Sequence, residues 1–165
     1  MWRRKIFMMF LVLLVGCTAT PLRSDISKYR LRTIGIYGSL ERHKGYPKEI
    51  LRFINFSLEE RISQFLMEEK GYRTLLWPPP SHPPTESLAL TTAGNQGADS
   101  LLVLKSSLIS STPSELKLET RFRLLTLPDQ RIIYRGSFKT IIDPASNKVD
   151  YASVAEGLKD FPGRE

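Results

Sequence analysis

The longest regular pattern of hydrophobic positions in this chain lies between Pro47 and Gly71. Apolar residues recur there every four positions, which places them on one face of an α-helix. This stripe consists of Ile50, Ile54, Leu58, Ile62 and Leu66, widened by Leu51 and Phe65. The other side is charged and is expected to face water, at Glu59, Glu60, Arg61, Glu68, Glu69 and Lys70. The pattern predicts a long amphipathic helix that ends at Gly71, since glycine often follows a helix end.

Other segments have the apolar runs or the alternation that are typical of β-strands. Strands are expected at 29–39, centred on 33–37, and at 72–77, 98–109, 116–127 and 131–142. A short helix is expected at 85–96. A last helix follows "DPASN", with a stripe made of Tyr151, Val154, Ala155, Leu158 and Phe161. The Pro-rich segment 78–84 excludes regular structure and is interpreted as a rigid crossover, with docking to an aromatic groove as the alternative.

Segments 116–127 and 131–142 are expected to pair as a hairpin. Keeping their large apolar residues on one face requires paired positions of equal parity, and therefore a loop of three or five residues around Pro128. Leu124 is then opposite Tyr134, Phe122 covers Gly136, Glu119 lies beside Lys139, and Arg123 is opposite Arg135. A phenylalanine over a strand glycine is a known way to shield bare backbone.

The order of these elements predicts the fold class. Strand–helix–strand units favour a sheet covered by helices, and right-handed crossovers limit the possible layouts. We therefore expect an α/β (α+β) domain, with a single sheet of about five strands covered by the long helix and a C-terminal helix.

The N-terminus has the three parts of a secretory signal. Arg3, Arg4 and Lys5 form a basic start, residues 6–15 are apolar, and Gly16-Cys17 follow. Ten residues rise about 15 Å as a helix, half of the roughly 30 Å hydrocarbon core, which argues against a membrane span. Cys17 leaves three interpretations of this segment open: a lipidation signal, an ordinary signal peptide with an incidental cysteine, or an uncleaved anchor.

The only cysteine of the chain adds a second signal. Leu14-Val15-Gly16-Cys17 resembles the lipobox of bacterial lipoproteins, in which the cysteine receives acyl chains and the signal is cleaved before it. The resemblance implies lipidation, palmitate included, at Cys17, and two or three acyl chains hold a protein stably on a membrane. Thr18 follows the cysteine, and by the sorting rule of enteric bacteria the absence of an aspartate there implies the outer membrane. The expected organisation is a signal peptide at 1–16, a tether at 17–28 and a single domain at 29–165.

Charge and cysteine content narrow the function classes. Three of the 24 Lys and Arg residues and none of the 17 Asp and Glu residues lie in the signal, so the formal net charge of residues 17–165 is +4 rather than +7. A charge this mild, without a dense basic run, does not indicate a nucleic-acid partner. A lipidated Cys17 leaves no thiol for a disulfide, a nucleophile or a metal site.

Catalytic chemistry is not evident in the sequence. No metalloprotease, hydrolase, P-loop or dinucleotide-binding motif is present. His43 and His82 fall in predicted loops and are expected to be exposed and without a role. The acidic pairs Glu59-Glu60 and Glu68-Glu69 are interpreted as solubilising residues. We expect no enzyme activity, no metal and no cofactor, with a small periplasmic hydrolase as an alternative.

The domain as a whole resembles a group of small bacterial envelope lipoproteins. The similarity rests on the lipobox, "TIGIY", "FINFSLEERISQFLMEEKGY", "GADSLLVLKSSL" and "LETRFRLLTLPDQRIIYRGSF". The group includes penicillin-binding-protein activator and curli-secretion-type lipoproteins and a neisserial lipoprotein family, with a fold like that of the N-terminal domain of the Tol propeller protein. This resemblance implies a lipid-anchored, non-enzymatic accessory or scaffold protein that faces the periplasm and binds other envelope proteins.

The second strand pair supplies the candidate binding surface. Its outward positions collect five cations, Lys117, Arg121, Arg123, Arg135 and Lys139. A solvated basic face is one interpretation, and a docking face for an acidic envelope protein or an anionic lipid is the other. The second interpretation also allows a lipopolysaccharide-assembly-type lipoprotein, because its basic face would have a use against anionic lipid.

Overall fold

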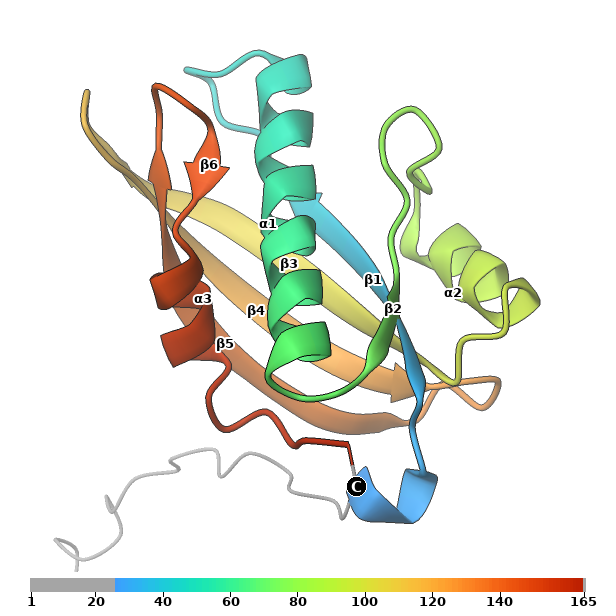
Figure 1. The fold of residues 1–165 in the computed structure, drawn as a ribbon. Helices are drawn as coiled ribbons and strands as arrows, with labels where there is room; N and C mark the ends of the chain where they lie inside the picture. The colour runs from blue at the N-terminus through green and yellow to red at the C-terminus, as the bar shows by residue number, and fades with distance from the viewer. Residues whose placement is uncertain (1–25, 165) are drawn as a thin grey trace, which may run out of the picture.

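The computed structural model describes residues 26–164 (Figure 1). The predicted signal peptide and the lipobox, with Leu14, Val15, Gly16 and Cys17, lie outside the described residues. The described part begins with a 3₁₀ helix, η1 (Ile26–Tyr29), which spans the expected boundary between the tether and the domain. The side chain of Ile26 is buried in the main core.

Within residues 26–164, six strands form one sheet in the order β2-β1-β3-β4-β5-β6. Their bounds are β1 (Thr33–Leu40), β2 (Arg73–Leu75), β3 (Ser100–Ser111), β4 (Leu116–Thr126), β5 (Ile132–Asp143) and β6 (Lys148–Val149). β1 is parallel to β2 and β3, and the remaining pairs are antiparallel. The expected number of about five omitted β6, because a strand of two residues after a turn carries no recognisable alternation.

The predicted helices are present. α1 (Lys48–Glu68) begins directly after Pro47 and is followed by Gly71, whose φ of +78° suits glycine. α2 (Glu86–Asn95) is capped by Thr85, whose side chain accepts from the Leu88 N–H at 3.3 Å. α3 (Tyr151–Gly157) is capped by Asp150, which accepts from the Ser153 N–H at 2.9 Å. Hydroxyl and carboxylate oxygens at these positions satisfy N–H groups that the helix cannot pair internally.

The two crossover helices lie on opposite faces of the sheet (Figure 1). α1 connects β1 to its neighbour β2, and α2 connects β2 to β3, which is the neighbour of β1 at its other edge. Because the chain moves in opposite directions across the sheet, two crossovers of the same hand must place their helices on opposite faces. α1 and α3 cover what we call the inner face, and α2 covers part of the outer face.

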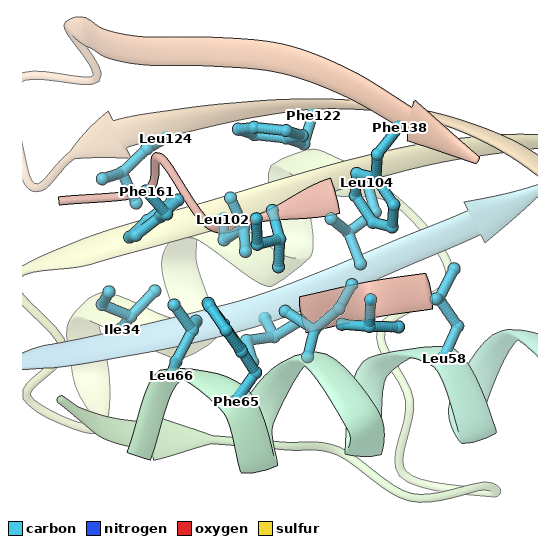
Figure 2. Packing of buried hydrophobic residues seen from close by; sticks show 14 of the residues in the cluster. Ile34, Leu58, Phe65, Leu66, Leu102, Leu104, Phe122, Leu124, Phe138 and Phe161 are labelled. Atoms are coloured by element: carbon cyan, nitrogen blue, oxygen red, sulfur yellow. The ribbon is translucent and has the colours of Figure 1, made fainter. Parts of the chain in front are cut away.

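The main core lies between the inner face and helices α1 and α3 (Figure 2). Ile54, Leu58 and Ile62 of the predicted stripe are 2%, 0% and 0% exposed, which confirms the prediction for this helix. Phe161 closes the far side, with its ring centroid 5.3 Å from that of Tyr134 and 6.3 Å from that of Phe122.

A second, smaller cluster lies beneath α2. Alternate residues of β3 divide between the two faces, since Leu102 and Leu104 enter the main core while Leu101 and Val103 enter the second cluster. Burial on both faces explains why this strand has a continuous apolar run rather than alternation. Trp77 joins the second cluster, and its indole N–H donates to Gln96 Oε1 at 3.0 Å.

The predicted hairpin register is confirmed. Leu124 pairs with Tyr134, Phe122 with Gly136, Glu119 with Lys139, and Arg123 with Arg135. Five residues, 127–131, separate the two strands, and a bulge lies between Leu124 and Leu125. The apolar face of the hairpin therefore reaches the core as the alternation required.

Candidate functional site

The outer face of β3, β4 and β5 carries the cations that the sequence singled out. α2 and the second cluster cover this face over β1, part of β3 and the end of β4 near Arg123 and Leu125, and the rest of β4 and β5 remains open. Arg121, Arg135 and Lys139 are exposed there, as predicted. Lys105 of β3 is also exposed and lies opposite Arg121. Lys105 was not predicted as part of this surface, although its parity with Leu101 and Val103 could have placed it on the same face.

We call Lys105, Arg121, Arg135 and Lys139 the basic face. Among residues 26–164 none of these four side chains forms an ion pair. Lys105 of β3 lies directly opposite Arg121 of β4. Like charges directly opposite each other weaken a sheet. An anion bound between them would remove this repulsion.

Two of the five predicted cations already have acidic partners. Lys117 Nζ lies 3.0 Å from Glu115 Oε1 in an exposed pair. Arg123 was expected to stand open on the outer face, but it is only partly exposed and forms an ion pair with Glu86. Glu86 comes from the first turn of α2, and the sequence pattern of β4 contains no information about a helix that packs across it. Lys117 and Arg123 therefore flank the basic face with their charges balanced.

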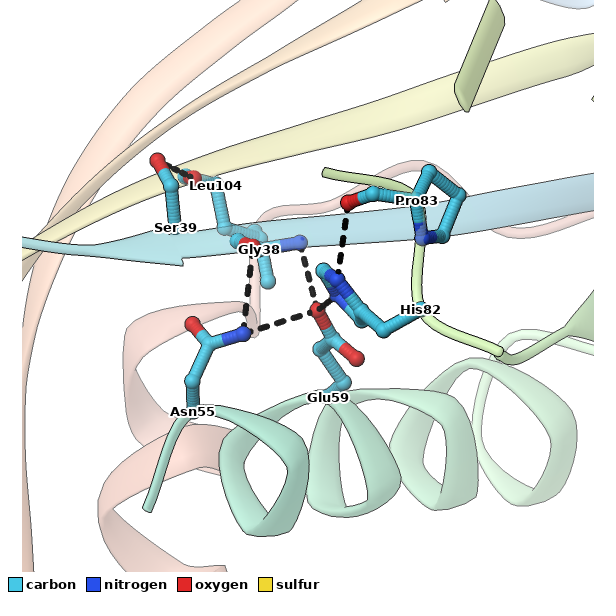
Figure 3. A network of polar contacts seen from close by, with 7 residues as sticks. All are labelled: Gly38, Ser39, Asn55, Glu59, His82, Pro83 and Leu104. Carbon is cyan, nitrogen blue, oxygen red and sulfur yellow. Dashed lines mark hydrogen bonds and ion pairs between the residues drawn. The ribbon is translucent and has the colours of Figure 1, made fainter. Parts of the chain in front are cut away.

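A polar network lies on the other side of β1, between the strand and α1 (Figure 3). Glu59 of α1 is fully buried, and its Oε1 accepts three hydrogen bonds. The donors are Gly38 N at 2.5 Å, Asn55 Nδ2 at 3.1 Å and His82 Nε2 at 2.8 Å. Asn55 Nδ2 also donates to the carbonyl of Gly38 at 3.1 Å. The network thus joins β1, α1 and the Pro-rich segment 78–84.

The prediction that Glu59 faces water was wrong. Glu59 is one position after Leu58 and four after Asn55, so it lies at the edge of the buried face of α1. Gly38 makes room for it, since a Cβ on Gly38 would lie 2.7 Å from Glu59 Oε1 and 2.7 Å from Asn55 Oδ1. A pattern of hydrophobic residues cannot show that a strand glycine opens space for a carboxylate.

The prediction that His82 is exposed and without a role was also wrong. Its side chain is 20% exposed and pairs with Glu59, and its ring is stacked on Tyr37 with centroids 5.3 Å apart. The hydrogen bond to Glu59 is the main cause that raises the pKa of His82, with burial acting against it. Burial raises the pKa of Glu59, and its hydrogen bonds, that from His82 first, oppose the rise.

The hydrogen bonds define the charge state of this pair. His82 Nδ1 lies 3.0 Å from the carbonyl of Pro83, which can only accept, so Nδ1 carries a proton. Glu59 Oε1 already accepts from two N–H groups, which leaves no suitable place for a proton on that oxygen. Nε2 must then donate as well. The geometry fits an imidazolium paired with a carboxylate.

This pair is not arranged as an acid–base site. Both ring nitrogens of His82 are engaged, by Pro83 and by Glu59. His43 lies in an exposed loop, where its Nδ1 accepts from Gly45 N at 3.3 Å. Among residues 26–164, no group of three or more His, Cys, Asp or Glu side chains could hold a metal ion. In the same range, none of the helices is both long and apolar enough to cross a bilayer.

Comparisons with protein-family models and with curated protein sequences find no match. Solved structures do match. Two structures of the PelC dodecamer from Paraburkholderia phytofirmans are each 11% identical to this chain, and each match covers 81% of this chain and 89% of the PelC chain. Their TM-scores are 0.56 and 0.54. A TM-score above one half at this coverage means that the domain shares its fold with PelC.

Bacterial lipoproteins are also among the matching structures. The C-terminal domain of LpoB from Salmonella enterica is 15% identical over 72% of this chain and 94% of its own, with a TM-score of 0.42. Lipoprotein GNA1162 from Neisseria meningitidis is 11% identical over 78% of this chain and 94% of its own, with a TM-score of 0.40. The similarity to the N-terminal domain of the Tol propeller protein stays a prediction.

Proposed function

We propose that this chain is a lipid-anchored, non-enzymatic accessory protein of the bacterial cell envelope. Cys17 carries the lipid, including palmitate, and the domain faces the periplasm from the outer membrane. The lipobox-like sequence Leu14-Val15-Gly16-Cys17 supports the anchor. A non-enzymatic role is supported by His82, whose two ring nitrogens are both engaged within the fold.

The function of the domain is to bind an acidic surface of another envelope protein through the basic face. The observation that carries this proposal is the pairing of exposed Lys105 with exposed Arg121 across β3 and β4, with exposed Arg135 on the neighbouring strand β5. The inner face of the same strands is buried, so the outer face is the one available to a partner. Exposed cations that are not held in ion pairs favour a partner of opposite charge and increase its association rate.

Photo-crosslinking in cells tests this surface directly. Ser137 is exposed on β5 and lies opposite Arg121, so a photoreactive residue there samples the basic face without removing a cation. Glu60 is exposed on α1, on the other side of the fold, and serves as the control position. We expect protein adducts from position 137 that are absent from position 60. The crosslinked partner should have an acidic surface at the point of contact.

The same experiment separates the partner classes. An adduct with a lipid or a glycolipid at 137, without a protein adduct, would favour the lipopolysaccharide-assembly-type alternative. Adducts with further copies of this chain would indicate self-assembly, which the dodecamer reported for PelC makes worth examining. The absence of any adduct specific to 137 would contradict a binding role for the basic face.

A further inference from the structure

Within residues 26–164, the Pro-rich segment 78–84 is joined to α1 by the hydrogen bond between His82 and Glu59. Five of its seven residues are prolines, which have no N–H group to donate. The Ser81 N–H donates inside the segment, to the Pro78 carbonyl at 2.8 Å. His82 reaches out of the segment, to Glu59 at 2.8 Å and onto the ring of Tyr37.

We propose that the Glu59–His82 ion pair is a proton-dependent latch. When His82 is protonated, the pair holds segment 78–84 against β1 and α1. When His82 loses its proton, the segment detaches and the Glu59 carboxylate becomes accessible to water. This inference concerns the side of β1 that packs on α1 and does not depend on the function proposed for the basic face.

The geometry explains why one proton decides between the two states. A neutral imidazole carries one N–H, so it cannot donate to both Pro83 and Glu59. With the proton on Nδ1, the lone pair of Nε2 would face a carboxylate oxygen 2.8 Å away. With the proton on Nε2, the lone pair of Nδ1 would face the Pro83 carbonyl 3.0 Å away. Either tautomer replaces an attraction with a repulsion.

Burial makes the carboxylate sensitive to this loss. Among residues 26–164, Glu59 Oε2 and Asn55 Oδ1 are buried without a hydrogen-bond partner. Glu59 therefore depends on the three donors at Oε1, of which only His82 carries a charge. A buried charge that loses its charged partner is strongly destabilised, and hydration relieves it. Water reaches the Glu59 carboxylate when segment 78–84 moves away from it.

The charged and titratable groups around His82 set the pH range. Glu59 on α1 raises the pKa of His82 above its ordinary value of 6.5, and Arg52 on the same helix partly opposes this. The pKa of Tyr37 on β1 is raised from 10.0, first by burial and then by Glu86 of α2 and by Glu59, so Tyr37 stays neutral while His82 titrates. The latch is closed at pH values below the pKa of folded His82, and it opens as the pH rises through that pKa.

Nuclear magnetic resonance on the full chain in detergent micelles tests the latch. The ring signals of His82 report its pKa, which is compared with the ordinary histidine value of 6.5. Hydrogen exchange at the Gly38 amide, which donates to Glu59, reports whether water reaches the carboxylate, with the exposed Lys44 amide as the reference for the intrinsic effect of pH. We expect His82 to titrate above the ordinary histidine value of 6.5, and the Gly38 amide to lose protection relative to Lys44 over the same range.

Two variants complete the design. Glu59→Gln removes the charge and should lower the pKa of His82. His82→Gln keeps a neutral donor and should remove the pH-dependent change at Gly38. The wild-type titration is decisive even if a variant fails to fold. Protection of the Gly38 amide that stays constant while His82 loses its proton, or titration of His82 at or below 6.5, would overturn the latch.

Discussion

The ring of Phe122 on β4 lies over Gly136 on β5. A Cβ on Gly136 would be 2.7 Å from Cζ of Phe122, inside the range that real Cβ atoms avoid. The ring has little space to move, because it is 6% exposed and its centroid lies 5.7 Å from that of Tyr134 and 5.9 Å from that of Phe138. Phe122 and Gly136 therefore form a matched pair across the hairpin.

Gly136→Ala should lower the free energy of unfolding by about 1–3 kcal/mol, because overpacking displaces side chains from their preferred positions. Chemical denaturation measures the change. Gly94→Ala is the control, since a Cβ at Gly94 meets nothing within 4 Å and alanine favours the helix by about 0.5–1 kcal/mol. If Gly136→Ala were as stable as Gly94→Ala, the ring would not be held over the glycine.

Leu58→Ala should cost about 2–5 kcal/mol of stability, because it removes a fully buried side chain and leaves a cavity between α1 and the sheet. Phe53→Ala on the same helix is the control. Phe53 is 63% exposed, so its truncation should change stability by no more than about 0.5 kcal/mol. Equal costs at the two positions would mean that α1 presents a different face to the sheet.

The stability of the chain should fall as the pH rises above about 6.5, the ordinary pKa of histidine. The folded pKa of His82 is raised, chiefly by Glu59, so its contribution is complete below the unfolded pKa and is lost as the pH rises through the folded pKa. The pKa of buried Glu59 is also raised, so the stability that Glu59 contributes is likewise lost with rising pH, beginning at a lower pH than for His82. Thermal unfolding of wild type and His82→Gln at several pH values measures this. The difference between the two proteins should shrink toward high pH, and a constant difference would contradict the linkage.

Cys17→Ser should abolish the incorporation of radiolabelled palmitate and release the protein from the membrane fraction. The reason is that the thiol is the only group of its kind in the chain that can take a thioether-linked lipid. Wild type should take up the label, and its mature N-terminus should be blocked at Cys17. A wild-type protein without label, cleaved at another position, would contradict the lipoprotein assignment.

Reversing Arg121 and Arg135 to glutamate should leave folding nearly unchanged, since exposed single charges change stability by about 0.5 kcal/mol or less. Crosslinking from position 137 should fall, and in the wild type it should weaken with added salt, because the Debye length is about 8 Å at physiological ionic strength. Arg42→Glu with Lys44→Glu makes the same change in net charge within an exposed loop. If this control lowered crosslinking equally, net charge rather than the basic face would be responsible.

The hydrophobic pattern by itself determined which face of each long element is buried. The fourfold repeat around Leu58 fixed the inner face of α1, and the alternation around Phe122 fixed both the core side of β4 and its register with β5. These predictions succeeded because removing apolar side chains from water is the main driving force for folding, and its spatial period can be read along one segment.

Only the tertiary structure decided what surrounds the polar residues. Glu59 is buried because Gly38 of β1 leaves room for its carboxylate and His82 supplies a proton from a segment 23 residues further along the chain. Arg123 is balanced by Glu86 because α2 crosses the outer face. Such contacts join segments that are distant in sequence, and a charge has no preferred side until a partner is placed beside it. The hydrophobic period of a single helix or strand therefore cannot predict these contacts.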